Sequence, residues 1–176
     1  MHAKMERAEK GMKNGPREIG HLTYDILKES INLPTEKRLA KGPVVIIECT
    51  EDIPCDPCVE ACKLQAIKKE SLTSPPRVDY ERCTGCTLCI DICPGLAIFV
   101  VDCSHDGKAH VYIPYEMLPV PKGGEEVAAL DRSGKTVGKA EVVKIRKGER
   151  GTSVIAIAVD RNLAMEVRSI KVNKGK

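Results

Sequence analysis

Residues 83–94 read CTGCTLCIDICP, and the four cysteines in this run determine how the rest of the chain is interpreted. They follow the spacing C-x2-C-x2-C-x3-C-P, which is typical of loops that hold a four-iron four-sulfur (4Fe–4S) cubane. Three thiolates on a tight loop can bind three corners of a cubane, whereas the fourth cysteine points away from it. The fourth cysteine therefore predicts a second cluster in the same chain.

A second cysteine run lies 31 residues upstream of the first. Shifting Cys55, Cys58 and Cys62 by 31 residues places them on the last three cysteines of the 83–94 run. The match continues further, because Ala-Ile recurs at the same distance after the last cysteine of each run. This internal duplication predicts two half-sites related by pseudo-twofold symmetry, each of which lends its last cysteine to the other cluster.

Crossed ligation predicts two sets of four cysteines. The first cluster takes Cys49, Cys55, Cys58 and Cys93, and the second takes Cys83, Cys86, Cys89 and Cys62. One corner departs from the repeat, because the shift places Asp52 at the position equivalent to Cys83. Either Cys49 supplies a thiolate from a longer loop, or Asp52 supplies a carboxylate to an easily lost iron. We favour Cys49, because iron–sulfur clusters are usually held by Cys thiolates.

The remaining cysteine, Cys103, is expected to be a small buried apolar residue. Two zinc sites are the alternative use of the other eight cysteines, but zinc sites favour separate Cys-x2-Cys pairs rather than one unbroken run. Five apolar side chains are expected to exclude solvent from the clusters: Ile53, Ile67, Leu88, Ile90 and Ile98.

Composition is that of a soluble globular protein, with 42% hydrophobic and 30% charged residues. One Phe, four Tyr and no Trp leave little aromatic bulk for a core, whereas nine cysteines are available to organise it. No segment approaches the roughly 18 apolar residues of a membrane span, and the polar start lacks the apolar stretch of a secretory signal. We therefore expect a cytoplasmic protein, in which clustered cysteines bind metal rather than form disulfides.

Charge is distributed unevenly along the chain. Residues 44–103 carry ten Asp and Glu against five Lys and Arg, while residues 1–43 and 104–176 carry an excess of Lys and Arg. An acidic, cysteine-bearing middle between basic flanks argues against nucleic acid near the metal region. It is compatible with docking on charged protein surfaces.

Local patterns predict an α+β fold in three segments. The first segment, residues 1–43, consists of a flexible arm over residues 1–16 and one short amphipathic helix over residues 19–31. The second is an iron–sulfur domain over residues 44–118. The third is a small β-barrel or sandwich over residues 119–176. Strands are expected over residues 44–47, 127–130, 137–145 and 154–159, with a hairpin over residues 96–113. Residues 163–170 are expected to form either a last strand or a short helix. We interpret the C-terminal segment, residues 119–176, as a docking module and call it the β-module.

At residues 83–94 and 49–62 the sequence resembles the two-cluster bacterial ferredoxin family, and the likeness covers roughly residues 44–103. The resemblance implies a compact core of two short helices and two β-hairpins, and low-potential one-electron transfer through two 4Fe–4S clusters. Lys63 stands where the first motif would have Pro, and 20 residues separate Cys62 from Cys83. These departures affect the first half-site more than the second.

The helical arm and the basic C-terminal segment are most simply explained as docking surface. The whole chain resembles a small electron-transfer subunit of a larger oxidoreductase, such as the ferredoxin-like subunits of flavin-dependent amine or amino-acid dehydrogenases. This likeness implies a hetero-oligomer, with a flavoprotein dehydrogenase and an electron acceptor as partners. No catalytic set or phosphate-binding loop is recognisable in the sequence, so substrate chemistry would belong to the partner.

Two other interpretations stay open. One is a freestanding ferredoxin shuttle. The other is a zinc-binding module that binds RNA through a basic face made of Lys135, Lys139, Lys144, Arg146 and Lys147. The scarcity of aromatic residues for base stacking counts against RNA.

Overall fold

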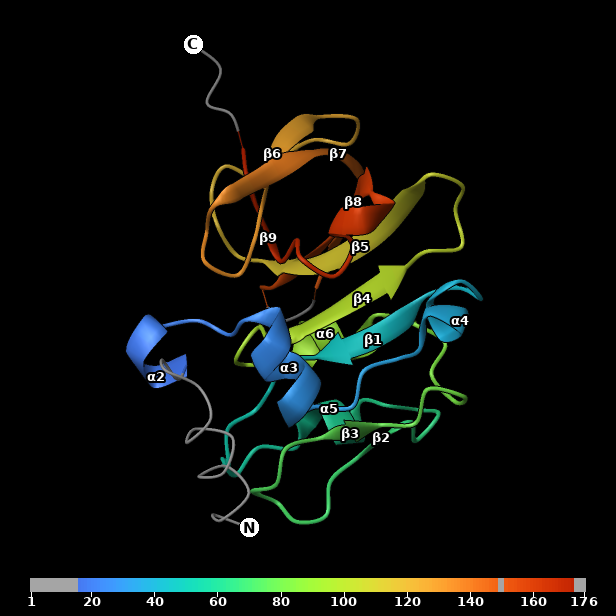
Figure 1. Ribbon diagram of the computed structural model, residues 1–176, viewed down its shortest axis with the longest axis vertical. Coiled ribbons are helices and arrows are strands. Elements are labelled where there is room, and N and C mark those ends of the chain that lie inside the picture. The colour runs from blue at the N-terminus through green and yellow to red at the C-terminus, as the bar shows by residue number, and fades with distance from the viewer. Residues whose placement is uncertain (1–15, 149–150, 173–176) are drawn as a thin grey trace.

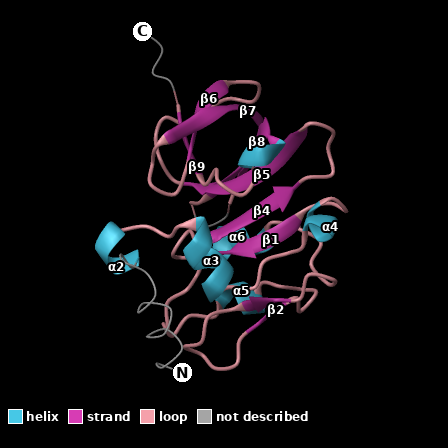
Figure 2. Ribbon diagram, viewed as in Figure 1, coloured by secondary structure: helices cyan, strands magenta, loops and turns pink. Residues whose placement is uncertain are grey.

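The computed structural model of the protein describes residues 16–148 and 151–172 (Figure 1). The helices are α2 (Pro16–Ile19), α3 (Tyr24–Ser30), α4 (Glu36–Leu39), α5 (Pro57–Glu60), α6 (Leu88–Ile92) and the 3-10 helix η1 (Arg161–Leu163). The strands are β1 (Val44–Ile47), β2 (Ile67–Lys68), β3 (Arg77–Val78), β4 (Ile98–Asp102), β5 (Lys108–Tyr115), β6 (Glu126–Leu130), β7 (Thr136–Lys147), β8 (Ser153–Asp160) and β9 (Ser169–Lys171) (Figure 2). Of the flexible arm that the sequence predicts, residues 1–15 lie outside the described ranges.

Seven strands form one antiparallel sheet in the order β1-β4-β5-β8-β7-β6-β9, and β2 and β3 form a separate antiparallel ladder. Figure 1 shows strands β5 to β9 at one end of the molecule and α5, β2 and β3 at the other, with β1 and β4 between them. The long strand β5 alternates exposed or half-buried with buried residues, because one of its faces covers a core.

Strands β1 and β4 are buried at every position because a hydrophobic cluster covers each of their faces. On β1, Ile46 faces the cluster enclosed by β5 to β9, while Val45 and Ile47 face the cluster around the cysteines. On β4, Val101 and Val100 divide between the same two clusters. These two strands therefore join the cysteine-bearing part of the chain to the β-module.

Most strands predicted from the sequence lie where they were expected. The run over residues 44–47 is β1, and the hairpin over residues 96–113 is β4 and β5, with Gly107 at φ +69° in the turn. Neither element expected over residues 163–170 covers that range, since η1 ends at Leu163 and β9 begins only at Ser169.

The single helix predicted over residues 19–31 is only partly right, because α2 ends at Ile19 and only α3 lies within that range. Gly20 adopts φ +78°, which ends α2. Thr23 then caps the next helix, since its Oγ1 accepts a hydrogen bond from the Ile26 amide at 3.3 Å. A glycine and a cap interrupt a hydrophobic pattern that otherwise has helical spacing.

The sheet continues through the segment boundary expected between residues 118 and 119. Strand β5 pairs with β8 along its whole length, from Lys108 opposite Asp160 to Tyr115 opposite Ser153. The two segments therefore share one sheet, and the division into three domains stays a prediction. Within the two described ranges, the helices are too short and too polar for any of them to span a membrane.

Candidate iron–sulfur centre

The 31-residue repeat of the sequence is also a repeat of local structure. Helices α5 and α6 begin 31 residues apart, and each lies between cysteines of its own run. Gln65 and Leu96, again 31 residues apart, both adopt φ +51° just after the last cysteine of their runs. The helix and the turn after it are thus built twice, although the residues just before the two helices differ, with Asp56 at φ −137° and Thr87 at φ +68°.

The two short ladders are exchanged between the halves. The strand before the first run, β1, pairs with the strand after the second run, β4, through Ile47 and Ile98. The strand before the second run, β3, pairs with the strand after the first run, β2, through Val78 and Ile67. Because each ladder takes one strand from each half, the halves face one another with their cysteines between them.

The second predicted set of cysteines surrounds one pocket. Cys62 from the first run lines it together with Cys83, Cys86 and Cys89 from the second run, and its volume is ≈ 420 Å³ including open solvent. The thiol of Cys86 is exposed, whereas that of Cys89 is buried. The structure therefore brings one cysteine across from the first half to the three of the second.

The first predicted set also comes together. Burial raises the pKa of the Cys58 thiol to about 11, and the neighbouring thiolates of Cys93, Cys55 and Cys49 add to this increase. Cys49 lies with these thiols, whereas Asp52 is exposed to solvent.

The two sets lie next to one another, and in each of them burial and neighbouring thiolates raise the pKa of a cysteine thiol. Burial raises the pKa of Cys89, and the thiolates of Cys83 and Cys86, together with Cys58 of the first set, raise it further. Thiolates gathered in this way repel one another unless positive charge lies among them. In the described part of the chain, no three His, Cys, Asp or Glu side chains are placed to hold a single metal ion. The four thiols of each set instead suit a larger cationic group, which would hold them deprotonated.

Backbone amides point at three of the sulfur atoms. The Ala66 amide donates to Cys62 Sγ at 3.2 Å, and the Ala97 amide donates to Cys93 Sγ at 3.4 Å. These two bonds are equivalent under the 31-residue shift. The Val45 amide donates to Cys83 Sγ at 3.5 Å. Hydrogen bonds of this kind stabilise the thiolate form and raise the potential of a bound cluster.

Two basic side chains fix the backbone of the cysteine loops. Arg38 of the N-terminal segment donates to the carbonyl oxygens of Cys83 at 2.6 Å and Tyr80 at 2.7 Å. Lys69 donates to the carbonyl oxygens of Cys55 at 2.5 Å and Leu72 at 2.7 Å. No sequence motif predicts these two roles, because both side chains bind backbone carbonyl groups that only folding brings close to them.

The expected hydrophobic shield is only partly right. Ile67, Ile90 and Ile98 are buried in the cluster that packs against the cysteines. Ile53 and Leu88, however, are 46% and 39% exposed, so the expectation that they exclude solvent is wrong. Ile53 lies in the loop before α5 and Leu88 is the first residue of α6, so both lie at the surface, where no other described element packs over them.

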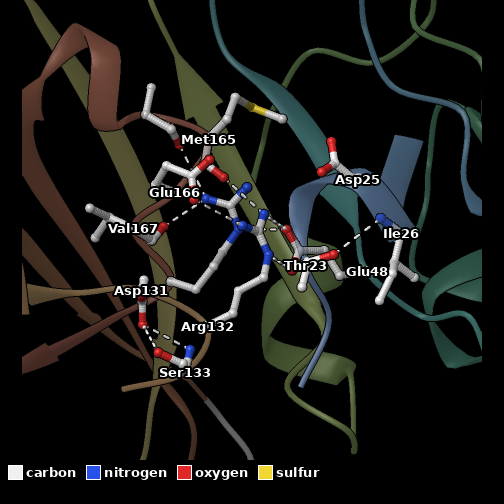
Figure 3. A network of polar contacts seen from close by, with 12 residues as sticks. Thr23, Asp25, Ile26, Glu48, Asp131, Arg132, Ser133, Met165, Glu166 and Val167 are labelled. Carbon is white, nitrogen blue, oxygen red and sulfur yellow. Dashed lines mark hydrogen bonds and ion pairs between the residues drawn. The ribbon is translucent and has the colours of Figure 1, made fainter. Parts of the chain in front are cut away.

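A buried ion cluster joins the chain next to Cys49 to the β-module. Glu48 accepts hydrogen bonds from Arg132 at 2.6 and 2.8 Å and from Arg168 at 2.6 Å. Figure 3 shows Arg132 between Glu48 and the carbonyl of Met165, to which it also donates at 2.8 Å. Sequence reasoning missed this cluster, because its members are up to 120 residues apart.

The ninth cysteine lies apart from the two sets. Cys103 is 5% exposed and belongs to the cluster enclosed by the β-module strands. It is a small buried apolar residue, as expected.

Comparison with known protein families supports the second half-site. Residues 76–99 match the family described as the 4Fe-4S binding domain (Fer4). The chain carries a 4Fe–4S binding domain. This match covers β3, α6 and the beginning of β4, with all four cysteines of the 83–94 run. The match indicates a 4Fe–4S cluster at this half-site. No solved structure matches the chain.

Proposed function

We propose that this iron–sulfur protein transfers electrons through two 4Fe–4S clusters, as the small subunit of a flavin-dependent oxidoreductase. The observation that carries the proposal is the pocket that Cys62 shares with Cys83, Cys86 and Cys89. That pocket provides the four thiolates of one cluster, and the other set of Cys49, Cys55, Cys58 and Cys93 remains for a second. The crossed arrangement is the one that two clusters require.

Two ligand sets follow from the same proposal. Cys62, Cys83, Cys86 and Cys89 would hold the second cluster, and Cys49, Cys55, Cys58 and Cys93 would hold the first. Cys89 of the second set lies in the hydrophobic cluster against which Cys58 of the first set packs, and this closeness supports electron passage from one set to the other. When bound, the clusters supply one-electron carriers, while the chain supplies their spacing, their amide hydrogen bonds and their apolar surroundings.

Exposed apolar residues beside each set support contact with two partners. Ile53 and Leu72 are 46% and 56% exposed near the first set, since the Cys55 amide bonds to the Leu72 carbonyl. Leu64 and Leu88 are 41% and 39% exposed and line the pocket of the second set. We assign one surface to a flavoprotein that gives up electrons singly and the other to an electron acceptor. A freestanding shuttle would use the same surfaces in turn.

Iron and acid-labile sulfide per chain on anaerobically purified protein test the proposal. We expect about eight of each, and magnetically interacting signals in the dithionite-reduced sample. About four of each would reduce the proposal to one cluster, and zinc without sulfide would overturn it. Purification from the native host then separates a subunit, which elutes with a flavoprotein, from a shuttle, which elutes alone.

A further inference from the structure

Arg146 of strand β7 reaches the loop that carries the second set of cysteines. Its Nη1 lies 2.5 Å from Asp91 Oδ2, and its Nη2 lies 3.2 Å from Asp91 Oδ1. The same Nη2 also donates to Thr87 Oγ1 at 3.2 Å. A planar guanidinium that binds a carboxylate at two points fixes both partners in orientation as well as in distance.

Both contacts of Arg146 fall inside the cysteine run. Asp91 lies in α6 between Cys89 and Cys93, and Thr87 directly follows Cys86. Thr87 adopts φ +68°, a left-handed conformation that few non-glycine residues adopt without support. The hydrogen bond from Arg146 therefore acts at the residue where the loop is most strained.

Gly148, which directly follows β7, also lies close to Asp91. A Cβ atom on Gly148 would lie 3.1 Å from Asp91 Cγ and 2.2 Å from the Thr152 carbonyl oxygen. A glycine at this position lets the β-module approach the carboxylate closely. The Asp91 side chain is 18% exposed and that of Arg146 is 37% exposed, so the pair is partly shielded from solvent.

We propose that Arg146 is a positioning residue of the second cluster, which sets its reduction potential by neutralising Asp91 and by holding Thr87. This inference rests on the proposed function. Reduction adds one negative charge to the cluster and its thiolates, so a nearby carboxylate opposes reduction and a nearby guanidinium favours it. Partial burial keeps this interaction from being screened to nothing by salt.

The test compares three variants of the full-length, cluster-loaded protein. Arg146→Met leaves Asp91 uncompensated and lowers the potential of the second cluster. Asp91→Asn leaves Arg146 uncompensated and raises it. The double variant returns close to wild type. We expect each single variant to change the equilibrium constant for reduction by roughly tenfold, which is about 59 mV for a one-electron couple.

The readout is the midpoint potential of each cluster at one pH, resolved by the hyperfine-shifted NMR signals of the cysteine β-protons. Lys139→Met is the matched control, because Lys139 lies on the same strand and forms an exposed ion pair with Glu126 at 2.7 Å. It should leave both potentials unchanged. Arg146→Lys keeps the charge but not the two-point contact, and should shift the potential less than Arg146→Met.

Opposite shifts of the two single variants, confined to the second cluster, are the expected result. Shifts in the same direction, equal shifts of both clusters, or no shift from Asp91→Asn would overturn the role of Arg146. Iron and sulfide analysis of the wild-type protein keeps this outcome separate from a failure of the proposed function. A wild type without a second cluster refutes the function itself, whereas a loaded protein with unmoved potentials refutes only this inference.

Discussion

Cys49 and Asp52 are the residues at which the two half-sites differ. The 31-residue repeat places Asp52 at the position of a ligand, but the structure leaves Asp52 exposed and groups Cys49 with Cys55, Cys58 and Cys93. We therefore expect Cys49→Ser to remove at least one iron per chain and to change the spectrum of the reduced first cluster. Asp52→Asn should keep about eight irons.

Iron analysis and EPR of both variants, prepared in parallel under anaerobic conditions, check this assignment. The opposite pattern, with iron lost from Asp52→Asn and retained in Cys49→Ser, would show that the carboxylate is the ligand. Loss of iron from both variants would indicate that binding of this iron depends on the whole loop over residues 49–55 rather than on one side chain.

Glu48 is a buried carboxylate that pairs with two buried guanidinium groups, those of Arg132 and Arg168. Burial alone would raise its pKa, but hydrogen bonds and charge from Arg132 and Arg168 outweigh burial and lower it. Replacing it by Gln removes the buried carboxylate that both guanidinium groups share and leaves Arg132 only Glu166, which is 44% exposed and lies 3.8 Å away. We expect Glu48→Gln to lower the free energy of unfolding by about 3–5 kcal/mol. Urea unfolding at pH 7, followed by circular dichroism, measures this loss.

The pH dependence of the same variant has a definite sign. Because the folded-state pKa of Glu48 is lowered from 4.5, its ionised form stabilises the fold above that pH. The advantage of wild type over Glu48→Gln should therefore be full near neutrality and shrink as the pH falls below about 4.5. Glu126→Gln, which breaks an exposed pair, should cost less than about 1 kcal/mol. A similar cost in both variants would contradict a special role for the buried cluster.

Gly85 shows how a loop of the second half-site depends on a strand of the sheet. It adopts φ +65°, and a Cβ atom there would lie 2.6 to 2.8 Å from Pro43 atoms just before β1. Gly85→Ala would force the loop between Cys83 and Cys86 away from β1. We expect iron to fall from about eight to about four per chain, with the loss confined to the second cluster.

Gly95→Ala is the control for this effect. Gly95 directly follows the same cysteine run, but no atom lies within 4 Å of a Cβ built on it. Its iron content should equal that of wild type. Equal iron in Gly85→Ala and Gly95→Ala would mean that the loop accommodates the methyl group and that its close approach to Pro43 is not needed for the site.

The elements that sequence reasoning predicted are those controlled by neighbours along the chain. The 31-residue repeat predicted two equivalent half-sites, the family resemblance implied two short helices, and two apolar runs around a turn predicted β4 and β5. Arg38, Arg132 and Arg146 could not be found in this way. Each acts on a group 42 to 84 residues distant, and no local period encodes such contacts.

The charge asymmetry of the chain is partly used within the molecule. An acidic middle and a basic C-terminal segment were interpreted as features for docking on partner surfaces. In the structure, Arg132 and Arg168 bind Glu48, and Arg146 binds Asp91, so the basic segment binds the acidic one. Long-range complementarity of this kind also joins the β-module to both half-sites. Docking surfaces for partners are therefore better sought at the exposed apolar residues beside the cysteines.

Removal of the β-module tests whether the iron–sulfur segment is an independent domain. A chain ending at residue 118 loses β8, the partner of β5 along its whole length, and exposes Val111, Ile113 and Tyr115. Exposing each of these side chains costs about 1.5–3 kcal/mol, a large share of the roughly 5–15 kcal/mol that holds a domain folded. We expect the shortened chain to be largely insoluble and to bind less than half of the wild-type iron.

Co-expression of residues 119–176 as a separate chain provides the decisive comparison. The ladder between β5 and β8 would then form again without a covalent link, as would the ion pairs of Arg132, Arg146 and Arg168. Solubility and iron content should therefore recover in part. A shortened chain that is soluble alone with the full iron content would contradict this dependence. It would mean that β1, β4 and β5 need no cover on the face that the module occupies, and that residues 44–118 fold as the separate domain predicted from the sequence.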